Sequence, residues 1–195
     1  MVVAQARGPG ITADGPWEYG LFVLGIVGVM SAAIEADRAN HKREGWMKRC
    51  EIDDPVDQIR ETLADSLAET MSLVVLESDR RTRAVTPEGV IKDYPGADLI
   101  LDIRTSKWGI HSPKTESTRR KIHYVAGYEG SFRLIDARKS AVVAEATCKI
   151  QFSNRGDPPT IKELLEDDCA LLDEGLTLSA QTCAKHYRTR ALGLE

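Results

Sequence analysis

The clearest pattern in the chain is a helical stripe that follows Asp54. Large apolar residues recur at intervals of three and four positions, which is the spacing of one face of an α-helix. Asp54 stands directly before Pro55, and this pair favours a helix start because aspartate can cap the free N–H groups and proline suits the first turn. We predict an amphipathic helix from Pro55 with one buried face. The stripe consists of Val56, Ile59, Leu63, Leu67 and Met71.

Four segments after this helix are predicted to form strands. A short apolar run at residues 72–77 comes first, and alternation of apolar and polar residues predicts longer strands at 98–108, 121–135 and 141–152. The polar turn at residues 136–140 is short enough for an antiparallel hairpin between the last two strands.

A second long helix is predicted to close the domain. Thr160 and Glu163 have the spacing of a capping box, so the helix is expected to run from Thr160 to about Arg190. Its apolar stripe consists of Ile161, Leu165, Leu172, Leu176, Cys183 and Tyr187. We therefore predict an α+β fold in the order α-β-β-β-β-α, with a mostly antiparallel four-stranded sheet and two long helices packed on one face.

The chain before the domain has two different parts. Residues 1–18 contain several glycines and prolines and are expected to be a flexible leader. Residues 19–49 hold an apolar helix and a basic connection, and the domain itself is expected at 50–192. The apolar run at 21–34 is shorter than the ~20 residues that cross a membrane. It is expected to pack on its own domain, to contact a partner or another copy, or to insert into a membrane. The expected interaction segment includes Leu21, Phe22, Leu24, Ile26 and Val29.

Composition and charge exclude some partners. Hydrophobic residues make up 42% and charged residues 29% of the chain, which is typical of a globular protein. The formal net charge of −4 gives no electrostatic reason to expect a phosphate backbone as partner, because such binding needs a clustered basic surface, so nucleic acid is not expected to bind.

Four cysteines bear on compartment and architecture. They form no CxxC spacing, so we expect no metal site. No cofactor is expected either. Cys148 and Cys183 both fall on inward faces of predicted elements, which predicts a disulfide between them, and Cys50 and Cys169 remain as a second pair. The alternative is a cytosolic protein with inert buried thiols.

The chain contains no common catalytic motif. Walker, GxSxG and HExxH spacings do not occur, so we expect a protein that is not an enzyme. A remote alternative is a hydrolase in which His111 or His123 acts with Asp102.

One aromatic group stands on predicted neighbouring strands. It consists of Trp108, Tyr124 and Tyr128. Cross-strand packing accounts for such a group, and the alternative is a ligand- or glycan-binding surface on a periplasmic module.

Three segments carry a resemblance to a known group of proteins. They are Tyr94-Pro-Gly-Ala-Asp-Leu-Ile-Leu-Asp-Ile-Arg-Thr-Ser-Lys-Trp108, then 128–138, and Val143-Ala-Glu-Ala-Thr-Cys148. Over roughly residues 52–187 the chain resembles uncharacterised lipoprotein-like cell-envelope proteins of Gram-negative bacteria. The resemblance implies a periplasmic or outer-membrane location. It also implies an export signal and a lipid anchor for peripheral membrane association, which we expect in a precursor and not in this sequence.

These observations lead to one functional hypothesis. We expect a non-catalytic, disulfide-stabilised envelope domain that acts by protein–protein interaction in envelope assembly or secretion. Its partner would be another envelope protein or a second copy of the chain.

Overall fold

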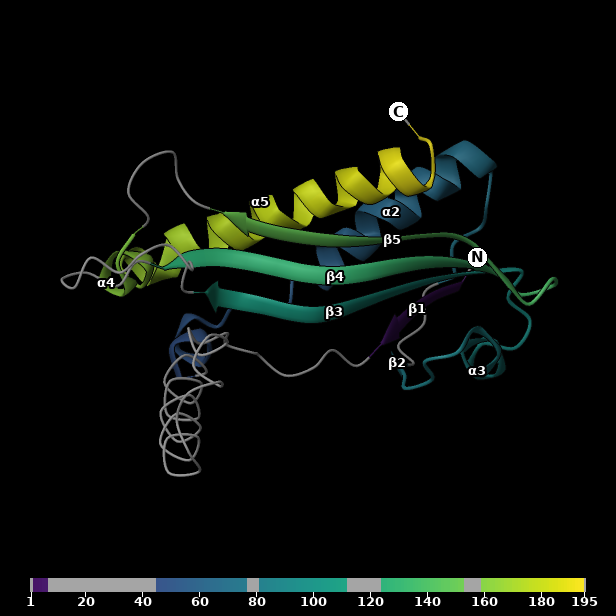
Figure 1. Cartoon of the computed structure of the whole chain (residues 1–195), viewed down its shortest axis with the longest axis horizontal. Helices are drawn as coiled ribbons and strands as arrows, with labels where there is room; N and C mark the ends of the chain where they lie inside the picture. Colours follow the sequence, from purple (N-terminus) through teal and green to yellow (C-terminus); the bar gives the residue numbers. More distant parts are fainter. Residues whose placement is uncertain (1, 7–44, 77–80, 112–123, 153–158, 195) are drawn as a thin grey trace, which may run out of the picture.

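The computed structural model describes residues 2–6, 45–76, 81–111, 124–152 and 159–194, and its centre is a curved sheet (Figure 1). In the described residues the sheet has five strands in the order β2-β1-β3-β4-β5. Residues 45–50 form a further short helix. The elements in chain order are β1 (Val2–Ala6), α2 (Val56–Met71), β2 (Arg81–Thr82), α3 (Pro87–Asp93), β3 (Leu99–His111), β4 (Val125–Asp136), β5 (Ala141–Phe152), α4 (Ile161–Leu164), the 3-10 turn Asp167–Cys169, α5 (Ala170–His186) and the π-helical turn Tyr187–Ala191.

The prediction of a four-stranded, mostly antiparallel sheet is wrong. Strands β3, β4 and β5 are antiparallel, as expected, but β1 pairs in parallel with both β3 and β2. Strand β1 comes from the segment that we expected to be a flexible leader, whereas residues 72–76 form no strand and contribute only an isolated bridge at Leu76. Strands of two and five residues are too short for an alternating pattern to reveal, and an apolar run does not by itself distinguish a strand from another buried segment.

Helix α2 confirms the predicted amphipathic helix. Its buried side chains include Val56, Ile59, Leu63 and Leu67, which lie in the main core between the sheet and α5. The Asp54 carboxylate accepts a hydrogen bond of 3.0 Å from the Val56 N–H group, as expected for a residue at the helix start.

The closing helix starts as predicted but is not continuous. Thr160 and Glu163 form the predicted capping box on α4, which ends after one turn. Asp167, Asp168 and Cys169 then have φ angles of 49°, 53° and 64°, and α5 begins at Ala170. Because aspartate tolerates the left-handed region better than most residues, the chain can turn here, and an apolar stripe gives no sign of that turn.

Helices lie on both faces of the sheet, which corrects the expectation of helices on one face only. Helices α2 and α5 cover the main core, whereas α3 encloses a second cluster that includes Val90, Tyr94, Ile100 and Ile135. Ile100 and Leu101 are neighbours on β3 and belong to the two different clusters, so α3 lies on the opposite face from α2 and α5.

The predicted N-terminal apolar helix at residues 21–34 lies outside the described residues. Within the described ranges, no helix combines the length and the apolar character that a membrane crossing requires.

Candidate interaction site

Both predicted disulfides are present in the structure. Cys148 and Cys183 join the middle of β5 to α5 with a Cα–Cα distance of 5.6 Å, and both are buried. Cys50 and Cys169 join the helix at residues 45–50 to the start of α5, also with a Cα–Cα distance of 5.6 Å. Disulfides persist in oxidising compartments, so the two bridges are compatible with an extracytoplasmic location.

The aromatic residues are core residues and not a surface patch. Trp108 lies directly opposite Tyr128 on neighbouring strands, with exposed fractions of 6% and 1%. Tyr124 is half-buried and packs edge-on against Trp46 at a ring separation of 5.9 Å.

The pairing of β3 with β4 shifts register between Thr105 and Lys107, just before the Trp108–Tyr128 pair. This irregularity could not be predicted from the sequence.

A chain of polar groups crosses the main core beside this aromatic pair. The Thr105 hydroxyl donates to the Asp54 carboxylate at 2.9 Å and lies 3.3 Å from the Tyr128 hydroxyl. Burial raises the pKa of Tyr128 well above its usual range, the hydrogen bond with Thr105 lowers it, and the negative charge of Asp54 raises it further. These groups therefore fix the start of α2 against β3 and β4.

The structure does not bring together the residues of the hydrolase alternative. His111 is buried at the end of β3, and His123 lies outside the described residues. Asp102 is nine positions from His111 on the same strand, or about 30 Å at 3.3 Å per residue. Asp102 therefore cannot orient the His111 ring.

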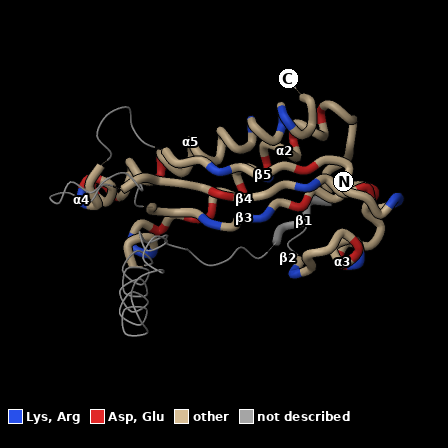
Figure 2. Tube along the Cα trace, in the orientation of Figure 1, with Lys and Arg blue, Asp and Glu red and all other residues tan. Residues whose placement is uncertain are grey.

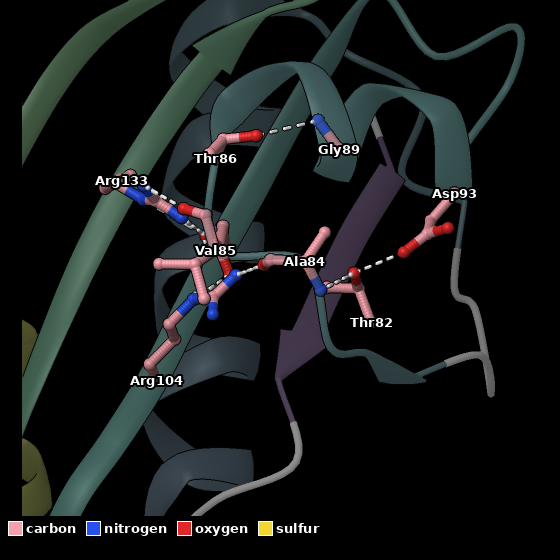
Figure 3. A network of polar contacts seen from close by, with 9 residues as sticks. Thr82, Ala84, Val85, Thr86, Gly89, Asp93, Arg104 and Arg133 are labelled. Carbon is pink, nitrogen blue, oxygen red and sulfur yellow. Dashed lines mark hydrogen bonds and ion pairs between the residues drawn. The ribbon is translucent and has the colours of Figure 1, made fainter.

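Asp102 instead forms a buried ionic network on the face opposite α5. Its side chain has an exposed fraction of 0% and accepts hydrogen bonds of 3.1 Å from the Nε atoms of Arg104 and Arg133. Figure 3 shows both arginines reaching the segment before α3, where Arg133 donates to the Val85 carbonyl at 2.9 Å and Arg104 donates to the Ala84 carbonyl. The network therefore holds this segment on the sheet. Sequence reasoning missed it because the strand register decides which charges meet.

Two acidic grooves flank the Cys50–Cys169 bridge. Their volumes are about 620 and 610 Å³, and Cys50 lines both of them. Within the described part of the chain, no three His, Cys, Asp or Glu side chains are placed to hold a metal ion. The acidic residues that line the grooves are Glu51, Asp53, Glu166, Asp167, Asp168 and Asp173.

An apolar surface follows the end of α2. Ser72 has a left-handed backbone and ends the helix, and the chain then continues with four apolar residues. Leu73 and Val75 pack on the main core. The exposed side chains between and beside them are Met71 at 49%, Val74 at 74% and Leu76 at 54%, which we call the apolar ridge. The expected interaction residues Leu21, Phe22, Leu24, Ile26 and Val29 lie outside the described residues.

Comparison with known proteins places the chain near several solved structures at low similarity. No protein-family model matches the chain, and no curated protein matches it in sequence. A Xanthomonas campestris protein of the DUF330 family matches with a TM-score of 0.36 at 13% identity, covering 67% of this chain and 59% of the other. A homologue of a neuraminyllactose-binding hemagglutinin from Helicobacter pylori matches with a TM-score of 0.38 at 9% identity, covering 95% and 83%. Lipoprotein GNA1162 from Neisseria meningitidis matches with a TM-score of 0.31 at 14% identity, covering 94% and 98%. At these values the matches assign neither a family nor a function to the chain.

Proposed function

We propose that this protein is a non-catalytic domain of the Gram-negative cell envelope that acts by binding another protein through the apolar ridge. The observation that carries the proposal is the ridge itself: three large apolar side chains within six residues, each about half exposed or more. Apolar side chains that are exposed close together along the chain are a feature of protein–protein interaction sites, whereas single ones are ordinary.

The ridge is supported from beneath. Because Leu73 and Val75 pack on the core, the extended chain that carries Val74 and Leu76 is held against the domain. Full burial of one such side chain contributes about 1.5–3 kcal/mol, so a partner that covers the ridge gains affinity without reordering this segment.

The proposed compartment is the periplasm or the periplasmic side of the outer membrane, and the proposed role is in envelope assembly or secretion. The two disulfides support this compartment, because thiols in the cytosol are kept reduced. The alternative of a glycan-binding module finds no support in the aromatic group, since Trp108 and Tyr128 are buried.

Site-specific photo-crosslinking in the native host tests the proposal. A photoreactive amino acid at Val74 is expected to give one adduct of defined mass, because this side chain is the most exposed of the ridge. The matched control is the same amino acid at Lys162 on α4, whose side chain is 86% exposed and lies in a different element. Adducts of equal yield at Val74 and Lys162, or no adduct at Val74, would contradict the proposal.

A further inference from the structure

Strand β5 forms one end of the sheet and has a long open edge. Among the described residues no strand pairs with its outer side, and the strand runs for 12 residues without proline or glycine. Its pairing with β4 is irregular only beside Val143, so residues 144–152 form a regular edge. Long regular edges are templates for pairing with another strand, and natural proteins usually shorten or interrupt them.

Charged residues on this sheet alternate in sign from strand to strand. Figure 2 shows the alternation across β3, β4 and β5 on the tube. Each row consists of directly paired residues, so its members share the face opposite α2 and α5. The first row is Lys107, Glu129 and Lys149, and the second is Asp102, Arg133 and Glu145.

Both rows end at the open edge with opposite signs. The first ends in Lys149, whose Nζ atom is 2.9 Å from Glu129 Oε2, and the second ends in Glu145. Glu145 and Lys149 are both exposed and stand on the same face, with Thr147 midway between them. An edge with this symmetry is complementary in charge to a second copy of itself.

We propose that two copies of this protein pair through the outer edges of β5, antiparallel, with Thr147 on the two-fold axis. Glu145 then faces Lys149 of the partner subunit, and the reverse pair forms on the other side of the axis. Each row of alternating charge continues into the other copy, and on the helix face Ala146 faces the partner's Cys148. The two sheets form one continuous sheet.

The charges select this register over its neighbours. Side chains alternate between the two faces of a strand. When the two-fold axis passes through a residue, the helix-covered faces of both copies lie on the same side of the joined sheet, and any other pairing puts them on opposite sides. With Ala146 or Cys148 on the axis, one of the two charged residues faces Thr147 of the other copy. With Glu145 or Lys149 on the axis, like charges meet. Thr147 is therefore the axial residue that brings both charge pairs together.

Charge reversal with rescue tests the pairing in purified, oxidised protein. Sedimentation equilibrium of the unchanged chain is expected to show an average molecular mass that rises from the monomer value to the dimer value as the protein concentration increases. In Glu145→Lys alone, and in Lys149→Glu alone, two attractive pairs become repulsive. The dimer dissociation constant is then expected to rise about tenfold or more. An equimolar mixture of the two variants restores both attractive pairs and is expected to recover the dimer.

The mixture also separates pairing from misfolding, because variants that failed to fold could not restore each other. A chain that stays monomeric up to its solubility limit overturns the proposal. So does a mixture that remains as weakly associated as each variant alone. The apolar ridge is not part of this edge. Crosslinking from Val74 therefore tests the proposed function, and association of the purified chain tests the dimer, so either one can fail without the other.

A second variant tests the register. Thr147→Cys is expected to form a disulfide-linked dimer rapidly, because facing Cα atoms in an antiparallel pair are about 4.5–5.5 Å apart. Gln151→Cys is the matched control, since residue 151 is also exposed on the same face but lies about 27 Å from its counterpart in this register. Equal crosslinking of the two variants would exclude the proposed pairing.

Discussion

Replacing Asp102 with asparagine removes the negative centre of the buried ionic network while keeping the size of the side chain. The carboxylate has an exposed fraction of 0%, and the side chains of Arg104 and Arg133 are only 21% and 20% exposed. Removing one member of a buried ion pair typically costs about 3–5 kcal/mol, because the remaining charges stay buried without compensation. In this variant the guanidinium groups of Arg104 and Arg133 lose the carboxylate that both of them bind. We expect the lower end of this range, about 3 kcal/mol, because water reaches part of each arginine.

Asp98→Asn provides the matched control for this experiment. Asp98 also pairs with an arginine, at 2.7 Å between Oδ1 and the Nε atom of Arg138, but these side chains are 64% and 76% exposed. An exposed pair of this kind contributes about 0–1 kcal/mol. The two variants therefore carry the same chemical change and differ in burial.

The assay is urea unfolding followed by far-UV circular dichroism, with both disulfides intact. Asp102→Asn is expected to lower the free energy of unfolding by about 3 kcal/mol and Asp98→Asn by less than about 1 kcal/mol. Amide exchange on α3 is expected to accelerate in Asp102→Asn alone, because Arg104 and Arg133 hold the segment before that helix. Equal losses of stability in the two variants would show that burial does not strengthen the Asp102 network.

Three further predictions concern buried residues. Replacing Cys148 and Cys183 together with alanine is expected to lower the free energy of unfolding by about 3.8 kcal/mol for their sequence separation of 35, measured by urea unfolding. No difference under oxidising conditions would contradict this value. Gly127→Ala places a Cβ atom 2.7 Å from His111 Cδ2, so overpacking is expected to cost about 1–3 kcal/mol, and an unchanged midpoint would contradict it. Because burial raises the pKa of Tyr128, its stabilising contribution is retained below pH ~10 and lost as the pH rises further. Absorbance titration at 295 nm should show fewer ionised tyrosines in folded than in unfolded protein at the same alkaline pH, and equal numbers would contradict this.

Local signals predicted the parts of the fold that depend on neighbouring residues. The stripe of α2, the capping box of Thr160 and the hairpin between β4 and β5 are each specified within a few positions of the chain. The pairing of Cys148 with Cys183 was also predictable, because both residues face inward in elements with a clear period.

The features that sequence reasoning missed depend on distant or irregular backbone. Strand β1 pairs with β3 across roughly a hundred residues, and no local pattern indicates such a parallel partner. The closing helix breaks at three consecutive residues with positive φ, which is a backbone property. The placement of Trp108 depends on a register shift, and the ionic network of Asp102 depends on which residues of β3 and β4 are paired. In each case the interaction is set by register or conformation and not by residue type alone.

We propose that this domain works outside the cytoplasm, where its disulfides form and its apolar ridge binds a partner. The most direct test is a thiol count by maleimide mass-tagging, on protein denatured in acid immediately after it is taken from its native host. We expect no tagged thiol without reductant and four tagged thiols after reduction, because all four cysteines are bridged. Four tagged thiols without reductant would contradict the extracytoplasmic location and the function proposed from it.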